Sequence, residues 1–382
     1  MVEVKDPRSG KPVYTVRYDY RELLPLLRHR YEPEHEAVKR VRERDRSLTM
    51  SIDARLQKRT SEILAAQLRK LKKEKGAAVI LDAATGDLLA SVSYPQPARM
   101  PPGLAPDGED DTLLDRARYG LYPPGSSFKI VTAMAALRRD PKLAGVLHEC
   151  KRLPDGRIGN YVKGWGRPIR DDVKDTGAHG MVAMQKGVAV SCNAYFAQLA
   201  TYDVGAPALL ETAKLLNISV ATPESAEQLQ RSIPQAGFGQ GQVIASPFQM
   251  ARAAATIAAR GAMPYGRWVT DGNNNRTQGP QPVIDAAQAD AIASFMRSVV
   301  TSGTGKAANI PAVAIAGKTG TAEIERGASH AWFIGFAPLN GPRKLAFAVL
   351  VENGQYGGTA AAPAAAEMMK AAAELGLFAS KE

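Results

Sequence analysis

The chain has 382 residues, of which 45% are hydrophobic, and a formal net charge of +11. This length supports one large domain with a sizeable core and a smaller appendage, and no repeat or low-complexity tract indicates a solenoid or collagen-like protein. Residues 1–75 carry 20 Lys and Arg against 12 Asp and Glu. This basic flank suits an anionic lipid or polymer surface, or it is a solvated face with intrahelical ion pairs. Nucleic acid is not expected as a partner, because no basic run is interleaved with aromatic residues and no nucleic-acid module motif appears.

The first part of the chain is predicted to contain an appendage, a helix and a hairpin. Residues 1–47 form the short appendage, which includes the strand-like segment Pro12–Tyr18. After it, Asp53 can cap a helix whose apolar residues recur at helical spacing. Two apolar runs, Ala77–Asp82 and Leu88–Ser93, are joined by a short turn sequence, which indicates a β-hairpin.

The rest of the chain is predicted to form helices and then strands. A helix is expected from about Ser126 to Arg139, because Pro123-Pro124-Gly125 precedes it and Asp140-Pro141 ends it. Residues 142–185 are polar, Gly-rich and without an assignment. Further helical patterns cover 185–202, 206–216, 246–260 and 285–302, strand-like runs cover Ala312–Ala316, Ala331–Phe336 and Leu345–Val351, and a last helix covers Ala361–Leu375, with Gly376 as its cap. Strands at both ends around a helical middle predict an α+β fold, in which one antiparallel sheet carries a largely helical insertion.

Three short strings carry candidate chemistry, and the first is Ser126-Ser127-Phe128-Lys129. If a helix begins at Ser126, the side chains of Ser126 and Lys129 lie on one face, and the serine sits at the positive end of the helix dipole. A nearby amine can accept the hydroxyl proton if burial lowers its pKa. Phe128 would point into the core. Taken alone, the same string is an ordinary helix cap followed by a surface lysine.

The other two strings are Ser191-Cys192-Asn193 and Lys318-Thr319-Gly320-Thr321. The first offers a hydroxyl for proton relay and an amide for hydrogen bonding, although Ser and Asn also favour turns and caps. The second follows the apolar run ending at Ala316 and supplies a cation and two hydroxyls for a carboxylate. Gly320 would leave room for a substrate backbone at the strand edge. Together the three strings form the inventory of a serine acyltransferase that needs no histidine or metal.

The chain has two cysteines, Cys150 and Cys192. Two cysteines allow one disulfide, but a pair alone does not establish it. Cys192 follows an apolar helical segment and is expected to be a small buried hydrophobe. No metal-ligand spacing is present, so the sequence predicts neither a metal nor a cofactor.

The three strings, in this order, resemble those of the penicillin-binding transpeptidases, the serine enzymes that cross-link peptidoglycan. The resemblance covers roughly residues 47–376 and includes Leu48–Asp53 with Leu56-Gln57, Leu81–Gly86, His179-Gly180, Gly237–Gly241, Ser246–Ala251 and His330–Pro338. It implies a transpeptidase domain at residues 48–382, with an antiparallel sheet of about five strands flanked by helices in an α/β/α arrangement. The inserted helical region would carry the Ser-x-Asn string.

The resemblance also implies roles for individual residues. Ser126 would form the acyl-enzyme with Lys129 as its base, and Ser191 and Asn193 would complete the proton relay and contact the substrate amide. Gly237–Gly241 is expected to shape a turn behind the site, since no Lys-Ser/Thr pair follows to complete a phosphate loop, and His330 is expected to be structural. The implied site comprises the catalytic residues Ser126, Lys129, Ser191, Asn193 and Lys318, and the substrate-binding residues Thr319, Gly320 and Thr321.

Within the family, the short appendage resembles that of the class B, monofunctional members. This implies stem peptides of peptidoglycan and β-lactams as ligands, and a membrane glycosyltransferase of the elongation or division machinery as a partner. The chain has no secretory signal and no apolar stretch long enough to span a bilayer. It begins abruptly in strand-like sequence, as a piece of a longer membrane-tethered chain would. We therefore expect it to act at the extracytoplasmic face of a bacterial envelope, with residues 1–47 as a pedestal or linker remnant.

Three other activities use the same strings. A serine β-lactamase would hydrolyse its acyl-enzyme, but class A members have Ser-Asp-Asn where this chain has Cys192, and an Asn closely following a downstream Glu. Glu224 and Glu227 lie in a suitable stretch without such an Asn. A D,D-carboxypeptidase would pass the same acyl group to water. A β-lactam sensor or scaffold would be acylated without transpeptidase turnover.

Overall fold

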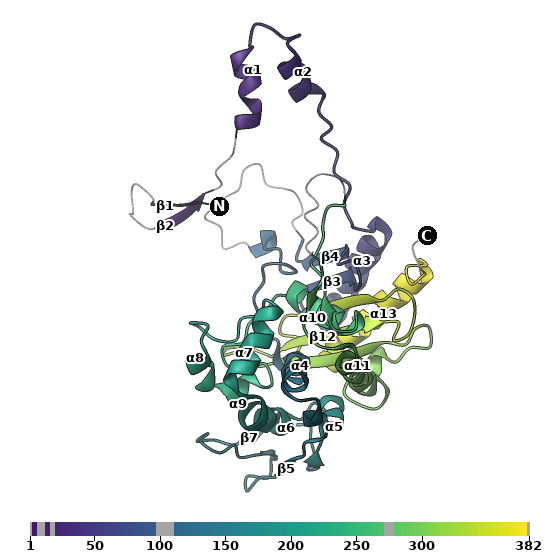
Figure 1. Cartoon of the computed structure of the whole chain (residues 1–382). Coiled ribbons are helices and arrows are strands. Elements are labelled where there is room, and N and C mark those ends of the chain that lie inside the picture. Colours follow the sequence, from purple (N-terminus) through teal and green to yellow (C-terminus); the bar gives the residue numbers. More distant parts are fainter. Residues whose placement is uncertain (1, 6–11, 16–19, 97–110, 271–278, 380–382) are drawn as a thin grey trace. The chain divides into compact units, whose positions relative to one another are not determined.

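A computed structural model describes residues 2–5, 12–15, 20–96, 111–270 and 279–379 (Figure 1). The chain divides into two compact units, Met1–Thr49 and Met50–Glu382. The first unit has an antiparallel pair of short strands, a 3₁₀ turn and two short helices: β1 (Val2–Lys5), β2 (Pro12–Thr15), η1 (Arg21–Leu23), α1 (Leu24–Arg28) and α2 (Glu36–Glu43). The strand expected over Pro12–Tyr18 is present over 12–15, and residues 16–18 lie outside the described residues.

The second unit is built on one five-stranded antiparallel sheet, as the sequence predicts. The hairpin of the first half supplies two strands and the last third of the chain supplies three. In spatial order the strands are β11 (Ala316–Ala322), β12 (His330–Ala337), β13 (Leu345–Val351), β3 (Gly76–Asp82) and β4 (Leu88–Tyr94). The expected strands β3, β4, β12 and β13 are therefore confirmed to within two residues at either end.

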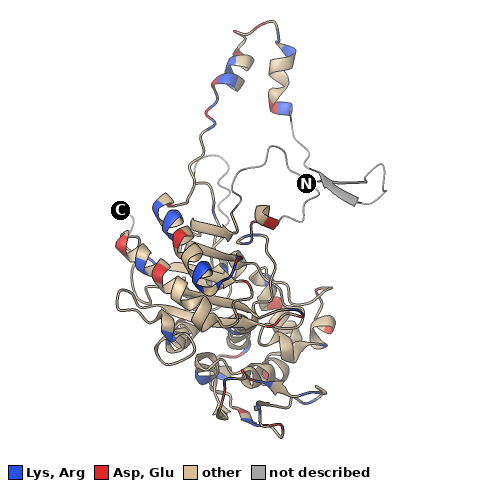
Figure 2. Cartoon of the chain, turned by 180° about the vertical axis from the view of Figure 1, so that it is seen from behind, with Lys and Arg blue, Asp and Glu red and all other residues tan. Residues whose placement is uncertain are grey.

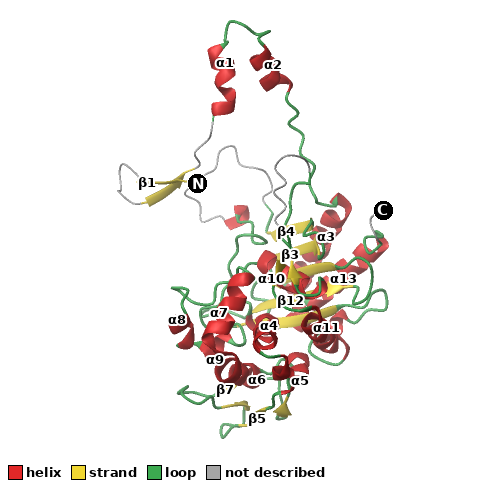
Figure 3. Cartoon of the chain, in the orientation of Figure 1, coloured by secondary structure: helices red, strands yellow, loops and turns green. Residues whose placement is uncertain are grey.

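Helices cover both faces of this sheet, so its strands are buried on both sides (Figure 3). Along β12, Trp332 and Ile334 join the core that contains α4 (Lys129–Arg139) and α10 (Pro247–Ala258). The alternate residues Ala331 and Phe333 join the core under α3 (Ala54–Leu71) and α13 (Ala362–Glu374). This two-residue alternation follows from the strand pleat. It explains why the strands read as continuous apolar runs.

The strand predicted over Ala312–Ala316 is displaced in the structure. It begins only at Ala316 and continues to Ala322, so the string Lys318–Thr321 lies inside the strand, where the sequence placed it after the strand. The apolar side chains of Val313 and Ile315 fill the core just before β11. The apolar residues thus lie in a buried segment that precedes the strand, and the strand itself contains the polar string.

Charged residues of both signs occur along the outer helices and loops (Figure 2). The five strands of the large sheet, in contrast, carry two charged residues, Asp82 and Lys318. Asp82 is paired with Arg343 at the sheet margin, at 2.7 Å. Lys318 is fully buried. A lysine inside an apolar sheet needs a specific reason, because desolvating its charge is costly.

The helical region between the strands is predicted correctly in outline but has one important break. The pattern expected over 185–202 is divided at residues 190–192, where Ser191 adopts a left-handed φ of 62°. Around this break lie α5 (Met184–Ala189), α6 (Asn193–Gln198), the π-helical turn η5 (Leu199–Val204) and α7 (Gly205–Leu215). The break places Ser191 and Asn193 at the start of α6, where both side chains accept hydrogen bonds from the Lys129 Nζ.

Residues 142–185, which received no sequence assignment, contain a small four-stranded antiparallel sheet in the order β7-β6-β5-β8. Its strands are β5 (His148–Arg152), β6 (Ile158–Asn160), β7 (Ile169–Arg170) and β8 (Gly180–Val182). The remaining elements are η2 (Asp111–Leu113), η3 (Gly125–Phe128), η4 (Pro141–Gly145), α8 (Ala226–Gln230), α9 (Ile233–Ala236), β9 (Ala262–Met263), β10 (Gln281–Pro282), α11 (Ala286–Thr301), η7 (Lys306–Ala308) and α12 (Gly357–Ala360). Across the described ranges, no helix is both long and apolar enough to cross a bilayer.

Candidate active site

The turn that carries Ser126 is a 3₁₀ turn, η3, which leads directly into α4 at Lys129. The sequence predicted an α-helix from Ser126, whereas the structure has this tighter turn, whose first residue, Gly125, has a left-handed φ of 52°. Ser126 is partly exposed, while Phe128 is fully buried in the core, as expected. The turn therefore presents the Ser126 hydroxyl to solvent from a rigid, buried base.

Gly320 has a different role from the one that the sequence indicated. A Cβ atom at Gly320 would lie 2.8 Å from the Pro124 carbonyl oxygen and 2.8 Å from the Cβ of Trp332. The missing side chain thus lets β11 pack against the turn that precedes Ser126, and the room it leaves is filled by the protein. Trp332 fastens the same turn, because its indole N–H donates to the Pro123 carbonyl at 3.0 Å.

Two buried lysines converge on Ser191. The Lys129 Nζ donates to Asn193 Oδ1 at 2.7 Å, to Ser191 Oγ at 3.2 Å and to the Ser191 carbonyl. The Lys318 Nζ donates to the same Ser191 Oγ at 2.8 Å and to the Thr319 carbonyl at 3.0 Å. Both lysine side chains are fully buried. The structure therefore joins one residue from each of the three strings through a single hydroxyl.

Burial changes the protonation of these amines. It lowers the pKa of Lys129 to about 8, against the opposing pull of the Asp171 carboxylate. Burial also lowers the pKa of Lys318 well below its ordinary value, and the positive charge of Lys129 adds to this effect. An ammonium has three N–H donors, and those of Lys129 are matched by three acceptors. Once Lys129 loses its proton, its nitrogen gains a lone pair that can take a proton from a neighbouring hydroxyl.

An open cleft of about 1210 Å³ lies above the two lysines. Of the predicted site residues, Ser126, Ser191, Asn193, Thr319 and Thr321 line it, whereas Lys129, Lys318 and Gly320 lie beneath its surface. The loop Gly237–Gly241 packs behind the turn, as expected, since the carbonyl of Gly239 accepts the Gly125 N–H at 3.0 Å. The structure thus brings hydroxyls, an amide and buried amines together at one opening.

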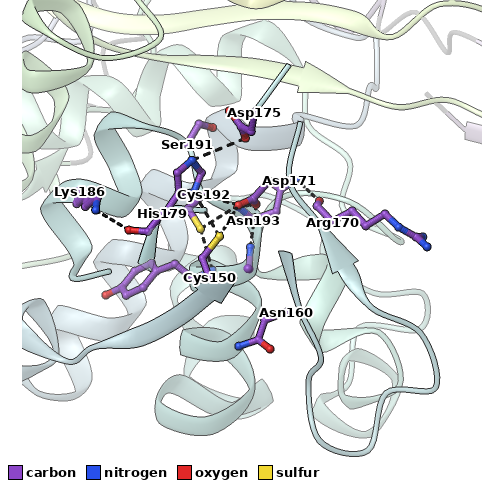
Figure 4. A network of polar contacts seen from close by, with 12 residues as sticks. Cys150, Asn160, Arg170, Asp171, Asp175, His179, Lys186, Ser191, Cys192 and Asn193 are labelled. Atoms are coloured by element: carbon purple, nitrogen blue, oxygen red, sulfur yellow. Dashed lines mark hydrogen bonds and ion pairs between the residues drawn. The ribbon is translucent and has the colours of Figure 1, made fainter. Parts of the chain in front are cut away.

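Behind Ser191 and Asn193 lies a second polar group, the rear cluster, formed by Cys150, Asp171, His179 and Cys192 (Figure 4). The Asp171 carboxylate is at its centre. Its Oδ2 accepts the thiols of Cys150 at 3.1 Å and Cys192 at 3.2 Å, and lies 3.1 Å from His179 Nδ1. Both cysteines are buried and free, so no disulfide joins them in this structure.

The rear cluster also holds the start of α6. The second oxygen of Asp171, Oδ1, accepts the backbone N–H of Asn193 and that of Ala194, the latter at 3.0 Å. These donors at a helix start have no partner within the helix, so the carboxylate caps it. The Asn193 Nδ2 donates to the Arg170 carbonyl at 2.9 Å. Asp171 therefore holds the backbone of Asn193, and the Arg170 carbonyl holds the side-chain amide that contacts Lys129.

The contact between Asp171 and His179 favours the charged form of both side chains. Although burial alone would raise the pKa of Asp171, its hydrogen bond with His179 and the charge of Lys129 hold that pKa below its ordinary value. The hydrogen bond to Asp171 raises the pKa of His179 to about 10. Cys192 is buried, as the sequence predicts, but it contacts a carboxylate and a thiol where apolar neighbours were expected.

The rear cluster has the donor set of a metal site. Its four ligand atoms lie within 4.8 Å of one another. Three edges, from Asp171 Oδ2 to the two sulfurs and to His179 Nδ1, measure 3.1 to 3.2 Å, and the edge from Cys150 Sγ to His179 Nδ1 measures 3.4 Å. Around tetrahedral zinc, such edges are about 3.3–3.8 Å. Sequence spacing gave no metal signal, because the four residues come from separate segments.

Sequence reasoning missed Asp171 and gave no role to Cys150. It named His179 only as part of a family resemblance. The cysteines were the one available sequence signal for this cluster: the chain has two, and both belong to it. The side chain of His330, expected to be structural, lies in β12, where its Nδ1 accepts the Asn353 N–H at 3.1 Å.

Comparisons with known proteins identify relatives of this chain. The chain is 31% identical over 370 residues to the peptidoglycan D,D-transpeptidase MrdA of Acinetobacter baumannii, covering 83% of this chain and 52% of that protein. It is 32% identical to PbpA of Mycobacterium tuberculosis, covering 78% of this chain and 67% of that one. The chain thus spans about half the length of the first relative and two thirds of the second.

Solved structures are similar in fold. Crystalline PBP2 of Pseudomonas aeruginosa, in complex with WCK 5153, has a TM-score of 0.71 at 28% identity, over 85% of this chain and 75% of that one. The imipenem acyl-enzyme of penicillin-binding protein A from M. tuberculosis has a TM-score of 0.71 at 25% identity, over 97% and 95%. A family profile described as the penicillin binding protein transpeptidase domain matches residues 76–370. This chain therefore belongs to the penicillin-binding protein transpeptidase family.

Proposed function

We propose that this chain is the catalytic part of a peptidoglycan D,D-transpeptidase. The observation that carries the proposal is the convergence of two buried lysines on the Ser191 hydroxyl, at the floor of the cleft that Ser126 lines. Relatives that match most of the chain are named peptidoglycan D,D-transpeptidases, and one matching structure is a β-lactam acyl-enzyme.

In the acylation step, Ser126 Oγ attacks the carbonyl of the penultimate D-Ala of a stem peptide. Its proton passes to the neutral amine of Lys129. The bond to the terminal D-Ala breaks, and its departing nitrogen takes a proton by way of Ser191 and Lys318. The product is an ester on Ser126 and free D-Ala.

In the second step, an amine of another stem peptide attacks the ester. It loses a proton through the same groups, and Ser126 is released with a new amide bond formed. The backbone N–H groups of Ser126 and Thr321 stabilise the oxyanion that develops in both steps. The substrate carboxylate, or that of a β-lactam, is bound by Lys318, Thr319 and Thr321, and Asn193 contacts the acyl amide.

The lining of the cleft bears on the alternative of a class A-like β-lactamase. Among the described residues that line it, Glu323 is the one glutamate, and neither Glu224 nor Glu227 belongs to the lining. The two glutamates that the sequence offered as class A-like activators of water are therefore not among the described residues that line the cleft. Because the relatives build cell wall, we place the activity on the extracytoplasmic side of the envelope, in a membrane-tethered protein that works beside a membrane glycosyltransferase.

The test is turnover of a synthetic stem peptide ending in D-Ala-D-Ala, with a D-amino acid as acceptor, followed by mass spectrometry. We expect release of D-Ala and formation of the exchanged peptide, both absent in Ser126→Ala. Hydrolysis without exchange would identify a carboxypeptidase. Acylation by a β-lactam without peptide turnover would identify a sensor, and either result would overturn the transpeptidase assignment.

A further inference from the structure

The cleft carries one carboxylate, Glu323, that the proposed steps do not use. Its side chain is exposed, lines the cleft and makes no hydrogen bond or ion pair with another described residue. The other acids of the lining share one segment after β7, and each contacts a partner within residues 171–179: Asp171, Asp172 and Asp175. An unpaired carboxylate at the surface of a substrate cleft attracts a cationic group.

The position of Glu323 relates it to the acyl-enzyme ester. Side chains alternate along a strand, and Thr319, Thr321 and Glu323, each two residues apart, all line the cleft. Glu323 directly follows the end of β11, about 7 Å along the extended chain from Thr321. Thr321 packs against the turn that carries Ser126, since a Cβ atom at Gly125 would collide with its carbonyl oxygen. Glu323 therefore lies at the strand end that adjoins the ester on Ser126.

We propose that Glu323 binds the acceptor of the transfer step, through the ammonium group of its attacking amine. The acceptor takes the place of the departed D-Ala, so it enters beside Thr319 and Thr321, which held the carboxylate of that D-Ala. Free amines, with a pKa of about 8 to 10, are protonated at neutral pH, and a carboxylate is a strong hydrogen-bond partner for them. This assignment rests on the proposed function and adds the acceptor class, a cationic amine.

Glu323 takes part in binding and forms no covalent bond. The nitrogen of the acceptor gives up two protons. One leaves to solvent as the amine becomes neutral, and the other passes to Ser126 Oγ through the lysine groups described above. One C–N bond forms, and the C–Oγ ester bond breaks. Because the acceptor is bound only in the transfer step, the charge of Glu323 acts on transfer and not on acylation.

The experiment compares the whole chain with Glu323→Gln, which removes the charge and keeps the shape. The donor is a synthetic stem peptide ending in D-Ala-D-Ala, and the acceptor is D-alaninamide, whose only charge is its ammonium. In the variant, the KM for D-alaninamide should rise by about tenfold while kcat changes little. Added salt should raise the KM of the wild type but not that of the variant, because it screens the ion pair. Acylation by benzylpenicillin and hydrolysis of the donor, which use no amine, should keep their rates.

The matched control is Glu325→Gln, which changes an exposed glutamate of the same loop that does not line the cleft and should behave as wild type. Glu323→Asp keeps the charge and should recover most of the affinity for the acceptor. An unchanged KM in Glu323→Gln, or an equal rise in Glu325→Gln, would overturn the proposal. A fall in hydrolysis in Glu323→Gln would do so as well, because it would identify Glu323 as an activator of water.

The proposed function fails separately, if the wild-type chain exchanges no D-Ala for any amine. In that case the dissociation constant of D-alaninamide, measured on the free chain by ligand-observed NMR, decides the role of Glu323. A dissociation constant about tenfold higher in Glu323→Gln would support the binding site, and equal constants in the two proteins would overturn it.

Discussion

Two polar groups lie on either side of Ser191–Asn193, the lysines in front and the rear cluster behind, and they differ in how their hydrogen bonds are formed. In front, Lys129 and Lys318 are buried amines whose hydrogen bonds meet at one hydroxyl beside an open cleft. Behind, the carboxylate, the two thiols and the imidazole of the rear cluster contact one another, and among these four residues only Asp171 also lines the cleft. The front group must exchange protons, and burial lowers the pKa of both of its lysines. The rear group, in contrast, holds the backbone at the start of α6, which positions Asn193.

The largest expected effect tests the front group alone. In Lys129→Ala the base for Ser126 is lost, so the rate of acylation by a β-lactam should fall by about 10³-fold. Folding should persist, because the rear cluster still holds α6. Stopped-flow acylation and circular dichroism measure the two properties. Lys142→Ala, an exposed lysine just after α4, is the control and should behave as wild type. An unchanged rate in Lys129→Ala would remove that residue as the base.

The next effect tests the rear group. Asp171→Asn keeps the shape of the side chain but removes a buried charge that accepts from two backbone N–H groups and two thiols. We expect the free energy of unfolding to fall by about 3 kcal/mol, with a slower acylation as a consequence. Urea denaturation measures this loss. The control Asp290→Asn removes only an exposed ion pair with Arg260 and should cost less than about 0.5 kcal/mol. Equal stabilities of the two variants would contradict a structural role for the rear cluster.

The pH dependence distinguishes the two groups without a mutation. Since burial lowers the pKa of Lys129 to about 8, its neutral form dominates above that pH and declines below it. The acylation rate constant should therefore rise from pH 6 to 8, by about tenfold per unit at the acid end, and level off above pH 9. Rates with a chromogenic cephalosporin give the profile. A rate that is flat or that falls across this range would show that Lys129 does not act as a neutral base.

The smallest effect tests how tightly the turn of Ser126 is held against β11. In Gly320→Ala, the added Cβ would lie 2.8 Å from the Pro124 carbonyl oxygen, so the turn must shift. A loss of about 1–3 kcal/mol in stability is expected, with a severalfold slower acylation. Thermal denaturation and acylation rates measure both. Gly145→Ala, whose Cβ would meet no atom within 4 Å, should be nearly neutral. If both variants acylate like wild type, close packing at Gly320 does not position Ser126.

The two groups also differ in how well the sequence predicted them. The sheet and the helix after Pro123-Pro124-Gly125 could be predicted from local patterns. The meeting of the three strings at one site was expected from their resemblance to the penicillin-binding transpeptidases. The exact place of Lys318 could not be predicted, because apolar Val313 and Ile315 resemble a strand and the true strand is polar. The rear cluster was not predicted, because Asp171 lies in a segment without helical or strand periodicity and its partners are distant in the sequence.

Intact-mass spectrometry after mixing the chain with benzylpenicillin tests the central claim most directly. The account predicts a long-lived increase by the mass of one penicillin, located on the peptide that contains Ser126 and absent from Ser126→Ala. A protein of unchanged mass, with the penicillin left intact or rapidly hydrolysed, would contradict it.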